Sequence, residues 1–136
     1  MLAATDGHAK NFSIRLLRGG RYHLTAFYDV LSAWPIIGKT ASKIPRQKVK
    51  LAMSVKGKHR YYNLDTIRRH HFEQMAQHFG IGAKGATLID QLIKQTPSVI
   101  ETVHQDLPQD YPHKLLDAVC ENLLDASTRL SEKHFT

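Results

Sequence analysis

The sequence predicts a mainly α-helical domain with one or two short β-hairpins ahead of its helices. Strand-forming residues flank a Gly-Gly pair within the first 30 residues, and apolar residues recur at helical spacing after Asn63. Of the 136 residues, 42% are hydrophobic and 23% are charged, which is typical of one globular domain. We therefore expect a single lobe over residues 1–136, with a hairpin in residues 1–30 and a helical core in residues 63–136.

The first hairpin is predicted from two runs of strand formers. These runs are residues 12–17 and 22–27, and Arg18-Gly19-Gly20-Arg21 lies between them. If the two glycines form the centre of a two-residue turn, Arg18 pairs with Arg21. A second, weaker hairpin is expected near residues 51–62, with Gly57 in its turn.

Three or four helices are expected after the second hairpin. Asn63 is a suitable N-cap for the first helix, and apolar residues 88–93 mark the next segment. Thr96 and Pro97 resemble the cap and the first residue of a new helix, and Pro112 opens a last long helix. Each segment carries one apolar stripe, so we expect the helices to share a core.

Charge, cysteine content and hydropathy restrict the class of protein. Lys and Arg number 19 against 12 Asp and Glu, and the net charge of +7 favours an acidic partner such as a nucleotide, a nucleic acid or an acidic protein. Cys120 is the single cysteine, which is typical of a cytoplasmic protein. The sequence contains no apolar run of about 18 residues, so no membrane span is predicted. No signal peptide is expected either.

Residues 5–11, Thr-Asp-Gly-His-Ala-Lys-Asn, give the strongest indication of chemistry. Asp6 and Asn11 have the spacing at which kinase catalytic loops place the aspartate that accepts the substrate proton and the asparagine that binds magnesium. A carboxylate can accept a proton, and an amide oxygen binds a hard cation without adding a second charge. On this spacing alone, ordinary turn and cap preferences explain the same residues better than catalysis does.

The hairpin is expected to return a third residue to this segment. Continuing its predicted register sets Asn11 opposite Tyr28 and Lys10 opposite Asp29. A slip of one residue would change the faces of the side chains but not their proximity. One base, Asp6, and two oxygen ligands would then meet in a site for Mg-nucleotide.

These segments resemble the HipA family of bacterial toxin kinases. The catalytic segment of that family reads Thr-Asp-x-His-x-Lys-Asn, and its magnesium aspartate lies in a Tyr-Asp motif after a short hairpin. Other segments that resemble the C-terminal lobe of the family, in the same order, are residues 48–53, 69–72, 107–112 and 129–131.

The resemblance implies a role for each matching residue. Asp6 resembles the catalytic base, and Asn11 and Asp29 resemble the magnesium ligands. The further cofactor-binding residues that it implies are His8 and Lys10, which line the ATP phosphates, and Tyr28 of the Tyr-Asp motif. ATP and Mg²⁺ are the cofactors implied for the intact kinase.

The resemblance also implies a fold, an activity and partners. Members of the family have a two-lobed kinase-like fold, of which this chain resembles the helical lobe. They are serine/threonine kinases that phosphorylate an aminoacyl-tRNA synthetase, which halts translation and favours dormant, drug-tolerant persister cells. A HipB-like DNA-binding antitoxin neutralises them and represses the operon, so the toxin contacts DNA indirectly.

Two departures from the family pattern bear on function. The phosphate loop and the strand lysine of a kinase would precede Asp6, where residues 1–5 stand. We therefore expect a truncated lobe that lacks the N-terminal kinase lobe and, alone, binds ATP weakly or not at all and transfers no phosphate. The family's operator contacts correspond to Gln77 and Gly80, which carry no charge for a DNA phosphate.

Other patterns have simpler interpretations. Residues 80–85 fit G-x-G-x-x-G but follow a predicted helix, so helix-ending glycines explain them better. His70 and His71 are expected to point to different sides of a helix, and a structural zinc site is not expected. Trp34 is expected to pack under the site. The basic stretches at residues 39–50 and 56–60 indicate a solvated face or a docking surface for an acidic partner.

Two alternative functions remain open. A small-molecule phosphotransferase of the aminoglycoside or choline kinase type has the same Asp, His and Asn spacing, but it usually carries a pair such as His-Gly where this chain has Ala4-Thr5. A non-catalytic module that docks an antitoxin or DNA belongs to a different class, and the net charge of +7 favours it.

Overall fold

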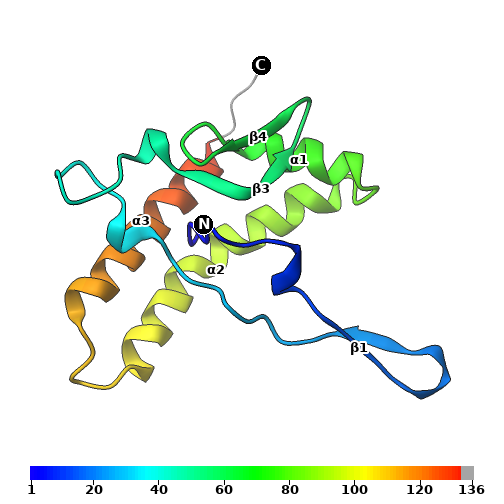
Figure 1. The fold of residues 1–136 in the computed structure, drawn as a ribbon, viewed down its shortest axis with the longest axis horizontal. Helices are drawn as coiled ribbons and strands as arrows, with labels where there is room; N and C mark the ends of the chain where they lie inside the picture. The colour runs from blue at the N-terminus through cyan, green and yellow to red at the C-terminus, as the bar shows by residue number, and fades with distance from the viewer. Residues whose placement is uncertain (133–136) are drawn as a thin grey trace.

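A computed structural model describes residues 1–132 of the chain (Figure 1). In this part of the chain, the three α-helices are α1 (Arg69–His78), α2 (Lys84–Asp106) and α3 (His113–Ser131). The strands form two antiparallel pairs, β1 (Ile14–Leu16) with β2 (Tyr22–Leu24) and β3 (Lys50–Lys56) with β4 (Arg60–Asn63). The predicted fold class, mainly α with short hairpins, is confirmed. None of the helices within residues 1–132 combines the length and the hydropathy of a membrane span.

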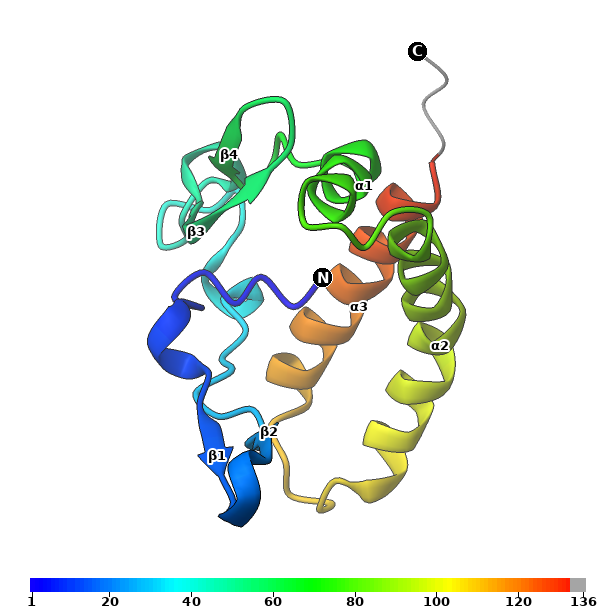
Figure 2. The same cartoon turned by 90° about the vertical axis from the view of Figure 1, so that its right-hand side faces the viewer.

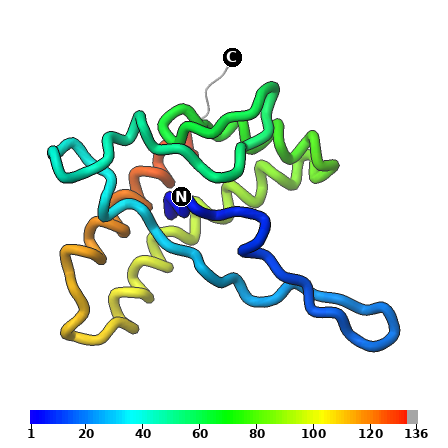
Figure 3. Tube along the Cα trace, in the orientation of Figure 1, coloured from blue at the N-terminus to red at the C-terminus, as the bar shows by residue number. Residues whose placement is uncertain are grey.

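Helices α2 and α3 form one side of the molecule, and the two hairpins lie on the other (Figures 1 and 2). Helices α2 and α3 pack side by side and run in opposite directions, while α1 and the β3–β4 hairpin lie together at one end of this pair. The β1–β2 hairpin projects from the body, and the segments that lead into and out of it run together along the trace in Figure 3. The base of this hairpin is where the candidate site residues fall.

Trp34 is the centre of the described core. Its side chain is 2% exposed and packs with Ala3, Ile37 and Val49. Its indole N–H donates a hydrogen bond to the carbonyl oxygen of Met1 at 2.9 Å, so the ring's only polar atom is satisfied. The expectation that Trp34 is a packing residue is confirmed.

Arg46 connects the segment around Trp34 to helix α3. Its guanidinium lies 5.1 Å from the Trp34 ring centroid, 3.1 Å from a carboxylate oxygen of Asp65 and 2.9 Å from one of Asp125. A planar guanidinium can stack on an aromatic face and meet carboxylates at its edges at the same time, which an ammonium cannot do as well.

The predicted register of the first hairpin is wrong by one residue. Leu16 pairs with Tyr22, and the Leu17 N–H donates to the Arg21 carbonyl at 2.8 Å, so Arg18, Gly19 and Gly20 form a three-residue loop. Both glycines have positive φ, 75° and 72°, which residues with a Cβ rarely adopt. The expected pairs of Asn11 with Tyr28 and of Lys10 with Asp29 are therefore not formed as strand pairs.

The second hairpin is confirmed, but the helix after it begins later than predicted. Asn63 ends β4 rather than capping a helix, because its side-chain oxygen accepts a hydrogen bond from the Asp65 N–H at 2.9 Å and closes a turn. Helix α1 starts only at Arg69. Asparagine suits both a cap and a turn, and its identity alone does not distinguish them.

The predicted break at Thr96-Pro97 does not occur, because α2 continues through Pro97. The Thr96 side chain is buried and its hydroxyl donates to the Leu92 carbonyl at 2.7 Å within the helix. Pro97 removes one backbone donor from an exposed side of α2, while packing of the buried side keeps the helix continuous. The expected start of the last helix after Pro112 is confirmed.

The two ends of α1 give one confirmed expectation and one correction. Gly80 and Gly82 have φ of 73° and 60°, so they act as helix-ending glycines as predicted. The rings of His70 and His71, which we expected on different sides of the helix, lie 3.9 Å apart between centroids. The His71 ring turns back toward the helix start, because its Nδ1 accepts the Arg68 N–H at 2.9 Å.

Candidate functional site

The segment around residues 5–11 folds into two consecutive tight turns. The Gly7 N–H donates to the Ala4 carbonyl at 3.1 Å, and the Asn11 N–H donates to the His8 carbonyl at 3.0 Å. The side-chain oxygen of Asn11 in turn accepts the His8 N–H at 2.8 Å. Asn11 is 7% exposed, so this polar side chain is fixed in place by burial and by its hydrogen bonds.

Asn11 and Asp29 meet at the base of the first hairpin, although they are 18 residues apart. The Asn11 amide N–H donates to a carboxylate oxygen of Asp29, with 3.1 Å between Nδ2 and Oδ2. Asp29 has a φ of 57°, in the left-handed region that few residues with a side chain adopt and that aspartate tolerates better than most. The predicted proximity of these two residues is therefore confirmed, even though the predicted register is wrong.

Tyr28 fixes the two arms of the hairpin at this point. Its hydroxyl donates to the Lys10 carbonyl, with 2.6 Å between the oxygen atoms, and lies 2.9 Å from the Ser13 hydroxyl oxygen. The edge of one phenyl ring also meets the face of the other in the Phe12–Phe27 pair, whose centroids are 5.7 Å apart. Tyr28 thus holds Asp29 near Asn11 through contacts on the other arm.

The remaining predicted residues are not joined to this cluster through their side chains. Asp6 and Lys10 are exposed, and within residues 1–132 no hydrogen bond or ion pair connects the Asp6 carboxylate or the Lys10 ammonium to Asn11 or Asp29. The His8 Nδ1 atom is buried and has no hydrogen-bond partner in the same described range. A buried imidazole nitrogen without a partner is costly unless a bound group supplies one.

The donor atoms at the hairpin base fit a small hard cation. Mg²⁺ prefers oxygen ligands and is usually held by one or two carboxylates together with substrate phosphates. The exposed Asp29 carboxylate supplies a charged oxygen, while the Asn11 amide directs its nitrogen to that carboxylate and its oxygen to the His8 N–H, so Asn11 would offer its oxygen beside Asp29 only after its amide group turns over. Burial and hydrogen bonds keep the Asn11 side chain at the base of the hairpin, within reach of a cation held by Asp29.

Two residues with positioning roles escaped prediction from the sequence. The Ser13 hydroxyl forms a hydrogen bond with the Tyr28 hydroxyl. The only feature of the sequence that could have indicated this contact is a polar serine among strand-forming residues. Arg46 lies within the basic stretch at residues 39–50, for which the sequence indicates a solvated face or a docking surface and not a buried ion-pair network. An arginine among several lysines could have indicated the role of Arg46, because arginine is preferred where one side chain forms several ion pairs at once.

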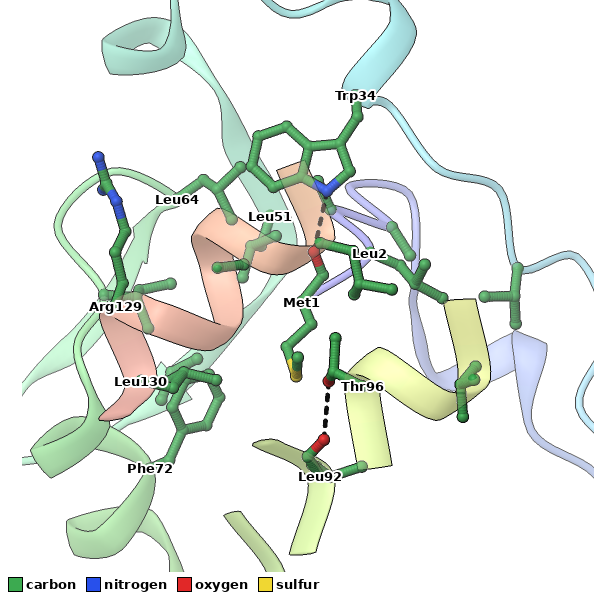
Figure 4. A pocket seen from close by; sticks show the side chains of 18 of the residues that line it. Met1, Leu2, Trp34, Leu51, Leu64, Phe72, Leu92, Thr96, Arg129 and Leu130 are labelled. Carbon is green, nitrogen blue, oxygen red and sulfur yellow. Dashed lines mark hydrogen bonds between the residues drawn. The ribbon is translucent and has the colours of Figure 1, made fainter. Parts of the chain in front are cut away.

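An apolar cavity of about 580 Å³ opens between the N-terminal segment and the helices. Figure 4 shows Met1, Leu2 and Trp34 on one side of it and Phe72, Leu92 and Leu130 on the others. Burial in this environment lowers the pKa of the Met1 amino group. Ala4 and Val30 also line the cavity, so it adjoins both arms of the candidate site.

Fold and site together define a mainly helical lobe whose first hairpin brings an amide and a carboxylate into contact. A sequence model of the HipA-like C-terminal domain matches residues 1–100 of the chain. The chain therefore belongs to the HipA-like C-terminal domain family, and the resemblance seen in its sequence is confirmed at the level of the family.

Proposed function

We propose that this chain is the helical lobe of a HipA-like serine/threonine kinase toxin and that the base of its first hairpin holds Mg²⁺ for ATP-dependent phosphoryl transfer. The observation that carries the proposal is the contact of Asn11 with Asp29 across 18 residues of sequence. Family membership over residues 1–100 supports it. The substrate proposed from the family resemblance is an aminoacyl-tRNA synthetase, and the inhibitory partner is a HipB-like antitoxin.

Each site residue has a separate task in this proposal. Asp6 is exposed in the turn and orients and deprotonates the substrate hydroxyl. Asn11 and Asp29 hold the metal, which when bound neutralises charge on the ATP phosphates. His8 and Lys10 offset further phosphate charge from the same segment.

The phosphate clamp of the kinase is proposed to come from a second lobe that docks on this one. Phosphoryl transfer requires a loop and a lysine that hold the phosphates, and the described site contains oxygen donors rather than such a loop. The cavity of about 580 Å³ beside the site offers an apolar docking surface, since most of the residues that line it are apolar.

The experiment is a phosphate-transfer assay with labelled ATP, Mg²⁺ and the synthetase. We expect no transfer by the 136-residue chain alone and transfer after addition of a purified N-terminal lobe from a HipA-like kinase. Asp6→Asn should abolish the transfer, while Asp106→Asn, an exposed aspartate at the end of α2, should leave it unchanged. Transfer by the isolated chain, or transfer that survives Asp6→Asn, would contradict the proposal.

A non-catalytic docking module is the second candidate function. The observation that favours it is that, within residues 1–132, no hydrogen bond or ion pair joins the Asp6 carboxylate to Asn11 or Asp29, so direct bonds do not align the proposed base with the proposed metal ligands. On this alternative, the chain would bind the antitoxin or DNA with the same affinity whether or not Asp6, Asn11 and Asp29 are substituted.

A further inference from the structure

The two halves of the sequence differ sharply in charge. Residues 1–64 contain twelve lysines and arginines and two acidic residues, Asp6 and Asp29, whereas residues 65–136 contain seven lysines and arginines and ten acidic residues. The first half supplies both hairpins and the loops between them, and the second half supplies the helices (Figure 1). The positive charge is therefore concentrated on the hairpin side of the molecule.

Among the cations of residues 1–64, Arg46 alone forms an ion pair with a residue of the described range, 1–132. All the ion pairs within residues 1–132 involve Arg46, Arg69 or Arg129. On the second hairpin, Lys56 and Arg60 are directly opposed across β3 and β4, and neither takes part in those pairs. Like charges at directly opposed positions destabilise a hairpin, so an anion bound between them would relieve a cost of the folded state.

These opposed cations line a groove of about 560 Å³ between the β3–β4 hairpin and the end of α1. Such a volume is in the range of about 300–1,000 Å³ that is typical of ligand sites. Phe79, which is 65% exposed, and Tyr62, which is 41% exposed, also line the groove. The remaining lining residues are Ala52, Met53, Ser54, Met75 and His78, and none of the lining residues is acidic.

We propose that this groove binds single-stranded nucleic acid, with phosphates at Lys56 and Arg60 and bases stacked on Tyr62 and Phe79. A cationic groove with exposed aromatic side chains provides the two interactions that such ligands require. A duplex hides its base faces and would leave both rings uncovered. An acidic peptide would satisfy the cations, but its carboxylates offer no flat face to the aromatic rings. The proposal is independent of ATP, magnesium and catalysis.

The test is fluorescence anisotropy of labelled oligonucleotides of about 12 nucleotides, one of deoxyuridine and one of uridine, with the full chain in EDTA. We expect binding that weakens as the salt rises from about 50 to 200 mM. Lys56→Gln with Arg60→Gln should reduce the slope of log affinity against log salt by about 1.4. Phe79→Leu keeps an apolar side chain without the π-face, and we expect it to weaken binding about fivefold or more.

Matched variants and competitors decide the result. Lys94→Gln with Lys114→Gln makes the same change in net charge at exposed positions on α2 and α3, and should change affinity less than twofold. Equal affinity for the DNA and RNA strands supports recognition of phosphates and base faces, and a preference for one strand identifies the sugar that is read. The proposal is refuted by an equal loss in the control pair, by equally tight binding of a duplex, or by equally effective competition from polyglutamate.

Discussion

Replacing Asn11 with aspartate tests the proposed metal site directly, because it changes one atom at a contact whose length is known. In the present structure, Nδ2 of Asn11 donates to Oδ2 of Asp29 across 3.1 Å. Asn11→Asp keeps an acceptor for the His8 N–H but places a second carboxylate against Asp29. Without a divalent cation, the hairpin base then holds two like charges in contact.

The size of the effect follows from this distance. Two unit charges 3.1 Å apart repel by about 1.3 kcal/mol at the dielectric constant of water and by about 5 kcal/mol at an effective value of 20. Asp29 is exposed, so we take a value near the lower limit, about 1.5 kcal/mol. The lost hydrogen bond to a charged acceptor adds about 1.5 kcal/mol. The total of about 3 kcal/mol corresponds to a fall in Tm of about 10 °C for a chain of this size.

The assay is thermal unfolding followed by circular dichroism, in EDTA and in MgCl₂ at about a hundredfold the dissociation constant, where bound cation adds about 2.7 kcal/mol. Magnesium should restore most of the Tm of Asn11→Asp. The matched variant Asn11→Ala, which loses the donor and the ligand together, should show no recovery. Sodium chloride at equal ionic strength controls for screening. If magnesium fails to raise the Tm of Asn11→Asp, or raises that of Asn11→Ala equally, these residues do not form the metal site.

Three further predictions concern the helices. Arg69 is buried and lies 2.6 Å from an Asp90 carboxylate oxygen, so Arg69→Met should lower the free energy of unfolding by about 2 kcal/mol in urea titrations, and a change below about 0.5 kcal/mol would contradict this role. Burial, with charge on His70 and Arg68, lowers the pKa of His71. The unfolded chain therefore binds the proton more readily, and the Tm should fall as the pH drops below about 6.5, with a smaller fall in His71→Gln. Burial raises the pKa of Cys120, so its thiol should react at least about tenfold faster with Ellman's reagent in guanidinium than in buffer.

The fold class and the location of the candidate site could be predicted from the sequence, but the hairpin register could not. Strand propensity defined the two arms, and any antiparallel return brings Asp29 back to Asn11. The register depends on whether the loop has two residues or three. Both Gly19 and Gly20 tolerate positive φ, so the residues between the strands fit either loop.

Helix boundaries were unpredictable wherever tertiary packing competes with a local signal. Pro97 is a strong local reason to end a helix, but the buried Ile89 and Thr96 hold α2 continuous across it. The contacts of Arg46 could not be predicted from the sequence either. They join residues far apart in the chain, Asp65 and Asp125, and no sequence pattern records which distant carboxylates a given arginine will meet.

The projecting β1–β2 hairpin links the affinity of the candidate metal site to local opening. Its ladder joins three residue pairs, and Ile14, Leu16, Tyr22 and Leu24 are all exposed, so little tertiary packing holds it closed. When the ladder opens, Asn11 and Asp29, the two proposed ligands, separate and the candidate site is lost. Closure and cation binding therefore stabilise each other by the same free energy. A partner that only covers the apolar side of the hairpin would tighten metal binding and slow amide hydrogen exchange in both strands, without contacting the ion.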